Sequence, residues 1–390
     1  MELTKQKKID LPRSSPDRIR SIQALIVKIP TIREHRLSSL SVTHQAYVLV
    51  RLKTEEGIEG IGEASTLGGP KWAEESVETI KAIIDNYLAP ALIGHPCDQI
   101  NAARTILDKA AKRNNAAKAA VETALFDALG KRLSVPIHTL FGGANRMHIP
   151  VLWALASGDP AQEVEEAISM IEAGRHREFK IKIGAKSAVE DVKRLEKVVQ
   201  GLGGRGHLKV VDANQAWDET TADRYIPTLE ELGIGILEQP LPDWNIDGMA
   251  RLAKRHCLPL LADESVFSTH DAVRISKFAA ADAISLKLVK CGGFLAMRDV
   301  AAIAEADGLG IYGGCLLESA IGTAAHLHVF ASLPNLHWGS ESFGPLILKD
   351  GLITEPLTYR DFGVEVPERP GLGVSLDEDK VRFYTRGGDQ

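Results

Sequence analysis

Short apolar runs alternate with helical stretches over the second part of this chain. After about Ile149 the runs are VLWAL, FKIKIG, LKVVDAN, GILEQP, PLLADE, AISLKL, LGIYGG and LHWGSE, and a helical pattern separates each pair. This alternation of strand and helix predicts a parallel sheet covered by helices, an α/β fold. Eight strand candidates fit a closed barrel of the TIM type, with one or two helices missing or degenerate at its ends.

The pattern before residue 149 predicts a separate α+β module. Runs at 22–29, 46–53 and 58–63 read as strands of an antiparallel meander, and the turn TEEG joins the last two. Helical periodicity follows at 72–91, 99–112 and 116–132. The predicted organisation is an arm (1–20), an α+β domain (21–148), a barrel (149–357) and a polar, strand-like C-terminal segment (358–390) that returns to the α+β domain.

The segment from Thr31 to Val42, TIREHRLSSLSV, lies between two predicted strands and is longer than a hairpin needs. A mobile lid and a plain surface insertion are equally good readings of it.

Composition excludes several classes of protein. At 390 residues the chain is long enough for two modules, and 44% hydrophobic with 25% charged residues is ordinary for a soluble protein. A net charge of -6 provides no basic surface for nucleic acid. The N-terminus lacks the apolar core of a secretory signal, and no run of 18 apolar residues predicts a membrane span.

Cysteine usage argues against both a disulfide framework and a zinc ribbon. The four cysteines are widely separated and form no CxxC pair: Cys97, Cys257, Cys291 and Cys315. A reducing, cytoplasmic location is expected.

Three acidic residues close successive apolar runs. Asp212 ends LKVVD, Glu238 ends GILE and Asp263 ends PLLAD, at intervals of 26 and 25 residues. A single acid in such a place often caps the following helix, but three in register converge at the carboxyl end of a barrel. Their mutual repulsion requires a cation, and carboxylate oxygens suit Mg²⁺ or Mn²⁺. The spacing therefore predicts a metal site.

The run FKIKIG places Lys180 and Lys182 on one strand face and three apolar residues on the other. The outer face of a barrel strand is apolar, so both lysines are expected to point inward; a KxK strand taken alone is more often an exposed edge. Lysines crowded beside each other and a cation are disfavoured in their protonated form. We expect at least one to have a depressed pKa and to act as a base.

Lys287 closes AISLK and is expected across the metal from the other lysines, although a buried lysine paired with an acid is the alternative. Strand alternation assigns Asp263 to the metal and turns its neighbour Glu264 away. Asn214 is a weaker candidate for supporting the metal ligands. Glu341, in HWGSES, could face the same cavity or form a structural ion pair.

Other polar residues carry less information. His326 and His328 lie two apart in a helical stretch and so do not share a face, which favours ordinary packed histidines over ligands. The turns GGANR and CGG lack the spacing of phosphate-binding loops.

Together the KxK strand, the Asp, Glu, Asp set and the later lysine resemble the muconate-lactonising subgroup of the enolase superfamily. Supporting stretches are GEAS at 62–65, GGPKW at 68–72, ALFDALGKRLSVPIHTLFGG at 124–143 and HWGSESFGP at 337–345. The resemblance covers about residues 22–375. It implies a modified (β/α)7β TIM barrel with an α+β capping domain made from both chain ends, and an active site between the two.

The resemblance also implies roles. Asp212, Glu238 and Asp263 would bind Mn²⁺ or Mg²⁺, Lys182 would transfer the proton, and Lys180 would be its electrostatic neighbour. Lys287 would be the lysine on the opposite face, and Glu341 an acid at the last strand. The implied reaction interconverts cis,cis-muconate and muconolactone through an enediolate, a step in catechol breakdown, in a homo-oligomer that is octameric or dimeric.

Several substrates are compatible with this set of residues. Chloromuconate cycloisomerases, N-acylamino acid racemases, dipeptide epimerases and o-succinylbenzoate synthases share it. Dipeptide epimerases usually carry Asp-x-Asp near the last strand, where this chain has Trp338 to Glu341, and this difference favours a dicarboxylate. Sugar-acid dehydratases place a His and Asp pair where this chain has Lys287 and IYGGC. A non-catalytic binding module is the remote alternative. Position alone suggests Arg33, His35 and Trp72 as capping residues that meet the substrate.

Overall fold

The computed structural model describes residues 17–36 and 41–385. Most of the predicted arm lies outside these residues, although the first strand already begins at Ile19. No helix in the described ranges is both long and apolar enough to cross a membrane.

An antiparallel sheet of three strands begins the capping part of the molecule: β1 (Ile19–Arg36), β2 (Ser41–Thr54) and β3 (Glu59–Thr66). The predicted meander is present, but its first two strands are longer than expected. They run through most of the segment 31–42, with an irregularity in register between Pro30 and His35. The sequence pattern did not predict that the described residues of this segment are strand. One reason is that a projecting hairpin needs no alternating apolar face, which is the signal that predicts strands. Residues 37–40 lie outside the described ranges, and the two readings of the segment, a lid and a surface insertion, both stay predictions.

Helices cover one side of this sheet: α1 (Val77–Ile83), the π-helix η1 (Ile84–Leu88), α2 (Ala89–Leu92), α3 (Ile100–Ala110), α4 (Asn115–Leu133) and α5 (Ile137–Leu140). The single helix predicted at 72–91 is therefore three consecutive pieces. Helix α4 packs directly on β3, because a Cβ at Gly60 or Gly62 would overlap the α4 backbone at Ala124 or Ala120.

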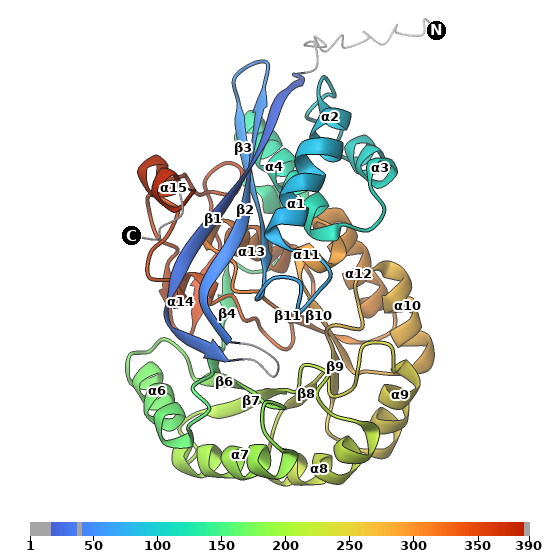
Figure 1. Cartoon of the computed structure of the whole chain (residues 1–390), viewed down its shortest axis with the longest axis vertical. Helices are drawn as coiled ribbons and strands as arrows, with labels where there is room; N and C mark the ends of the chain where they lie inside the picture. Colours follow the sequence, from blue (N-terminus) through green and yellow to red (C-terminus); the bar gives the residue numbers. More distant parts are fainter. Residues whose placement is uncertain (1–16, 37–40, 386–390) are drawn as a thin grey trace, which may run out of the picture.

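Seven parallel strands form the barrel sheet in the order β11-β10-β9-β8-β7-β6-β5, and helices surround them (Figure 1). In chain order the elements are β5 (Trp153–Leu155), α6 (Pro160–Glu172), β6 (Glu178–Lys182), α7 (Ala188–Leu202), β7 (His207–Asp212), α8 (Glu219–Glu231), β8 (Ile236–Glu238), α9 (Ile246–Arg255), β9 (Leu260–Ala262), α10 (Thr269–Phe278), β10 (Ala283–Leu286), α11 (Leu288–Cys291), α12 (Phe294–Ala306), β11 (Gly310–Gly313) and α13 (Ala320–Ser332).

The barrel closes through Ser340, which bridges Val151 on one side and Gly313 on the other. The run LHWGSE, predicted as the eighth strand, is thus reduced to isolated bridges. The modified (β/α)7β barrel with an α+β capping domain is confirmed as the fold.

Most barrel helices begin at a polar residue that accepts backbone N–H groups, which explains why short strands are followed promptly by helices. The capping side chains are Asp159, Ser187, Asp218, Asn245, Ser268 and Ser319.

The C-terminal segment packs against the capping part. After the short helix α14 (Gly344–Ile347), its elements are β12 (Tyr359–Arg360), β13 (Gly363–Glu365) and α15 (Glu378–Thr385). Strand β13 pairs with β12 on one side and with β4 (His148–Pro150) on the other. The Leu372 N–H donates to Asp127 Oδ1 at 2.8 Å, and Arg51 pairs with Glu378 at 2.8 Å. The strand-like tail therefore ends in a helix that was not predicted, although Asp377, which accepts its first N–H groups, is an ordinary start signal.

Candidate active site

Three buried carboxylates lie together at the carboxyl end of the barrel. Asp212 is the last residue of β7 and is paired in register with Glu238, the last residue of β8. Asp263 follows β9 directly. All three are at most 1% exposed. Since parallel strands end at the same edge, the sequence spacing is realised as one cluster of acids.

Lys180 lies inside this cluster. Its Nζ donates to Glu238 Oε2 and Glu341 Oε1, both at 2.7 Å, and lies 3.1 Å from Asp212 Oδ2. Burial alone would lower the pKa of Lys180, but Asp212, Glu238 and Glu341 raise it well above its usual value. Lys180 is therefore held as a cation, the reverse of the direction expected for a base.

Lys182 lies beside Lys180 on the same strand face. Its Nζ donates to Asp212 Oδ2 at 2.7 Å and to Asn214 Oδ1 at 3.2 Å. Asn214 in turn donates to Glu264 Oε1 at 3.0 Å. Glu264 thus turns toward the site, and the prediction that it points away is wrong. Strand alternation does not apply to it, because β9 ends at Ala262, two residues earlier.

A second pair of lysines holds Asp263 from the other side. Lys287 Nζ lies 2.5 Å from Asp263 Oδ2 and 4.4 Å from the centre of the Trp72 ring. Lys290 Nζ donates to Asp263 Oδ1 and to its backbone oxygen, each at 2.7 Å. Burial opposes the charge of Lys287, but Asp263 and neighbouring acids raise its pKa. Sequence reasoning missed Lys290, although its spacing of three from Lys287 is the spacing of one helical face.

Glu341 faces the same cluster through Lys180, and its Oε2 lies 3.9 Å from the thiol of Cys315. His326 and His328 are buried in α13; the Leu288 N–H donates to His326 Nε2, and His328 lies against His138. The seven predicted site residues are therefore brought together, and the two histidines are not part of the acid cluster.

The capping residues suggested by position lie at different places. Arg33 donates to Glu166 and to the Ala154 carbonyl, so it docks β1 on the barrel. His35 is buried, and burial together with Lys182 lowers its pKa well below the usual value. Trp72 covers Lys287.

The donor set fits a hard divalent cation. Glu238 Oε1 is buried without a hydrogen-bond partner among the described residues. Burial and the nearby Asp212 charge raise the pKa of Glu238 well above its usual value, so a further cation would stabilise its carboxylate. In the described part of the chain no three acidic, histidine or cysteine side chains are arranged to ligate one ion, and lysines hold Asp212 and Asp263. Metal binding would have to rearrange these ion pairs, and the metal site stays a prediction.

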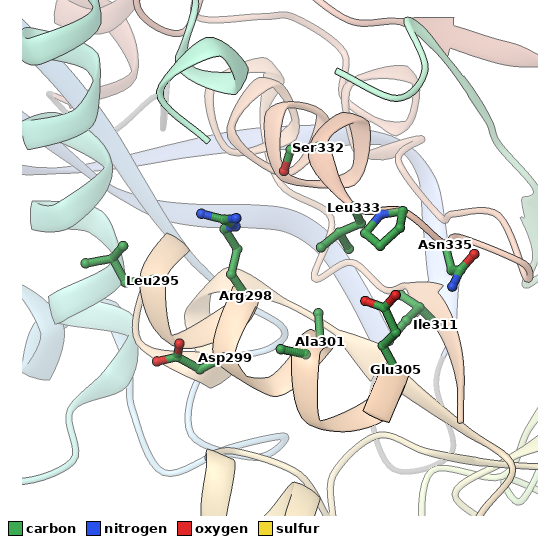
Figure 2. Close-up of a pocket in the computed structure, with 11 residues that line it drawn as sticks. Leu295, Arg298, Asp299, Ala301, Glu305, Ile311, Ser332, Leu333 and Asn335 are labelled. Atoms are coloured by element: carbon green, nitrogen blue, oxygen red, sulfur yellow. The ribbon is translucent and has the colours of Figure 1, made fainter. Parts of the chain in front are cut away.

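Two cavities lie against the barrel, and none of the seven predicted site residues lines either of them. A cavity of about 20 Å³ lies between the capping loop and the barrel, lined by Trp72, Phe267, Lys290 and Leu316 among others. Ligand pockets are usually about 300 Å³ or more, so this cavity is too small to hold a substrate. A cavity of about 290 Å³ between α12 and the end of α13 contains none of the predicted site residues (Figure 2).

Two family models match the chain. Residues 21–142 match the mandelate racemase / muconate lactonizing enzyme N-terminal domain, and residues 162–380 match the enolase C-terminal domain-like model.

Individual relatives align over nearly the whole chain. A chloromuconate cycloisomerase of Cupriavidus necator is 46% identical, covering 95% of this chain and 99% of its own length. Muconate cycloisomerase 1 of Pseudomonas putida is 46% identical, covering 94% and 98%. The crystal structure of muconate lactonizing enzyme from Pseudomonas fluorescens complexed with muconolactone superposes with a TM-score of 0.93 at 44% identity, covering 95% and 99%.

Proposed function

Because the chain belongs to the muconate cycloisomerase branch of the mandelate racemase / muconate lactonizing enzyme family, it is an isomerase of the intramolecular lyase class, and we propose that it interconverts cis,cis-muconate and muconolactone. The observation that carries the proposal is the placement of Lys182 and Lys287 on opposite sides of the buried acids Asp212, Glu238 and Asp263. Cations on two sides suit a substrate with two carboxylates.

The chemistry of the lysines follows from their contacts. When one muconate carboxylate oxygen forms a bond to the diene, an electron pair moves toward the other carboxylate and its α carbon must gain a proton. Lys182, fixed by Asp212 and Asn214, gives that proton as an ammonium group and takes it back in the reverse direction. Lys180, bound by three acids, stays charged and stabilises the negative charge that develops.

Enzymes of this superfamily generally depend on a divalent metal. We propose Asp212, Glu238 and Asp263 as ligands of Mn²⁺ or Mg²⁺, which when bound would neutralise charge on a substrate carboxylate. Lys287 faces the site from the opposite side, and Glu341 orients Lys180.

The test follows the ultraviolet absorbance of cis,cis-muconate with purified protein and Mn²⁺. We expect the diene absorbance to decay, and the rate to fall about 10²- to 10⁴-fold in Lys182→Ala and to background after EDTA treatment. Lys186→Ala, an exposed lysine in the adjoining loop, is the matched control and keeps the wild-type rate.

Folded, Mn²⁺-loaded wild-type protein that leaves the absorbance unchanged would exclude muconate as the substrate. N-acylamino acids and dipeptides would then be screened for exchange of the α proton with solvent.

Chlorinated muconates are the second candidate substrates, because chloromuconate cycloisomerases are as similar to this chain as muconate cycloisomerases. The ratio of kcat/KM for 2-chloromuconate and unsubstituted muconate distinguishes the two. The proposal extends to a cytoplasmic place in catechol breakdown and to an octameric or dimeric homo-oligomer, which light scattering of the purified protein measures.

A further inference from the structure

Helix α11 is a single turn, yet it determines where the Asp263 carboxylate points. Its N-cap residue, Lys287, holds Asp263 Oδ2, and Lys290 holds Oδ1. The start of the helix is fixed from within the barrel, since the Leu288 N–H donates to His326 Nε2 at 2.9 Å. A four-residue helix is not stable alone, so its other end needs a support as well.

That support comes from the capping domain. Asn115, the first residue of α4, donates its side-chain amide to the Lys290 carbonyl at 2.6 Å and to the Phe267 carbonyl at 3.1 Å. Phe267 lies four residues beyond Asp263 in the chain, and Lys290 donates a hydrogen bond to the Asp263 carboxylate. One amide thus joins the two chain segments on either side of the contact between Asp263 and Lys290.

The backbone is strained to bring Asn115 into place. Arg113 and Asn114 have φ angles of 52° and 51°; asparagine tolerates the left-handed region, whereas Arg113 is held there at a cost of about 1 kcal/mol or more. Asn114 makes no side-chain cap, and Glu75 accepts the N–H groups of Ala116 and Ala117 instead. Strain retained in this way is typical of a position with a function.

We propose that Asn115 is a positioning residue through which the capping domain fixes α11 and, with it, the orientation of Lys287, Lys290 and Asp263. It touches neither substrate nor metal in this assignment and acts through the backbone of α11. Its kinetic consequence rests on the proposed muconate activity, whereas its consequence for metal binding rests only on the proposed Mn²⁺ site.

The experiment compares Asn115→Ala and Asn115→Asp with a matched control. The aspartate keeps the shape of asparagine but cannot donate to the two carbonyls when ionised. The control is Asn145→Ala, because Asn145 also donates its amide to a barrel-helix carbonyl, that of Ser332 at 3.0 Å, but has no contact with α11. Each variant is measured for kcat and KM with cis,cis-muconate, and for the Mn²⁺ dissociation constant from the paramagnetic resonance signal of free Mn²⁺.

We expect Asn115→Ala to lower kcat about ten-fold and to raise the Mn²⁺ dissociation constant about ten-fold, the usual effect of losing a group that orients a metal ligand. We expect KM to change less than two-fold. Asn115→Asp should lower kcat and weaken Mn²⁺ binding at least as much as Asn115→Ala, whereas Asn145→Ala should have the kcat and the Mn²⁺ dissociation constant of the wild type.

Two outcomes would overturn the assignment. One is that the Asn115 variants behave like Asn145→Ala. The other is that kcat falls only in proportion to the folded fraction seen by circular dichroism, with an unchanged Mn²⁺ dissociation constant, since that is a purely structural role. If wild-type protein does not act on muconate, the proposed function fails, and the Mn²⁺ constants alone decide the role of Asn115.

Discussion

Asp263 and Glu238 are both buried acids of the site, but the residues around them balance their charges differently. Asp263 forms ion pairs with both Lys287 and Lys290. Glu238 pairs with Lys180, but Lys180 would still have ion pairs with Asp212 and Glu341 if Glu238 were neutralised. Without metal, Asp263→Asn should lower the free energy of unfolding by about 3 kcal/mol, because it leaves buried lysines unpaired. Glu238→Gln should lower it by less than about 1 kcal/mol. Urea unfolding in EDTA measures both, and equal losses would contradict this reading of the charges.

Glu122 links stability to pH. It is buried beside the N-terminus of α12, where the backbone N–H groups of Phe294 and Leu295 only partly offset the cost of burying its charge. Gly293 leaves the space that the carboxylate fills. Burial raises the pKa of Glu122 to about 8 from 4.5. Because the folded state favours the protonated form, the contribution of Glu122 to the free energy of unfolding is fully present below pH 4.5. It is lost as pH rises through about 8.

Glu122→Gln should therefore be less sensitive to pH than the wild type. We expect the difference in unfolding free energy between the two to change by more than about 1 kcal/mol from pH 5 to pH 8. Urea unfolding at both pH values measures it, with Glu231→Gln, an exposed acid, as the control. Parallel curves for wild type and Glu122→Gln would rule out the assigned pKa.

Sequence patterns could identify residues that lie at strand ends. Asp212, Glu238 and Lys182 follow directly from alternation, because the strand fixes which way each side chain points. Glu264 and Lys290 could not be placed in this way, since Glu264 lies beyond the end of β9 and Lys290 lies in the short helix α11. Asn115 was missed because its partners are backbone carbonyls of a different domain, and no sequence pattern records such contacts.

At the scale of elements, an ion pair helps to dock the end of β1 on the barrel. Arg33 contacts Glu166 of α6 at 3.0 Å, and Trp153 donates to the same carboxylate at 2.9 Å. We expect Arg33→Ala to raise KM for muconate about five-fold with little change in kcat, because a partly exposed pair contributes at most about 1 kcal/mol and the neighbouring His35 lies near Lys182. Steady-state kinetics measure this beside Arg20→Ala, an exposed arginine of the same strand. A fall in kcat at constant KM would contradict it.

Element prediction succeeded where packing imposes a period. The barrel strands from β6 to β11 are buried on both faces and separated by capped helices, so their apolar runs mark them closely. The prediction of elements failed where local backbone geometry, rather than the apolar pattern, determines the secondary structure. The π-helix η1 interrupts a continuous helical pattern, and the last barrel strand survives only as the bridges of Ser340.

For the whole molecule, the capping domain and the barrel share buried polar contacts. Glu63 of β3 accepts the N–H of Ser319 at the start of α13, and Tyr47 donates to the Leu317 carbonyl at 2.6 Å. Breaking either contact inside the protein would leave buried groups unsatisfied. We therefore expect the two parts to unfold together, with coincident urea transitions by tryptophan fluorescence and far-ultraviolet circular dichroism in EDTA. Two separated transitions would show that these contacts do not couple them.

The return of the C-terminal segment to the capping domain also orders events during synthesis. Arg51 and Asp127 leave the ribosome early, but their partners Glu378 and Leu372 are added near the end. While the barrel is being translated, Asp127 Oδ1 lacks its hydrogen-bond donor, because the Leu372 N–H has not yet been synthesised. The capping domain is thus synthesised first but completes its contacts only after the C-terminal segment is added. We expect proteases to cleave β1 to β3 in a nascent chain that is stalled before residue 370.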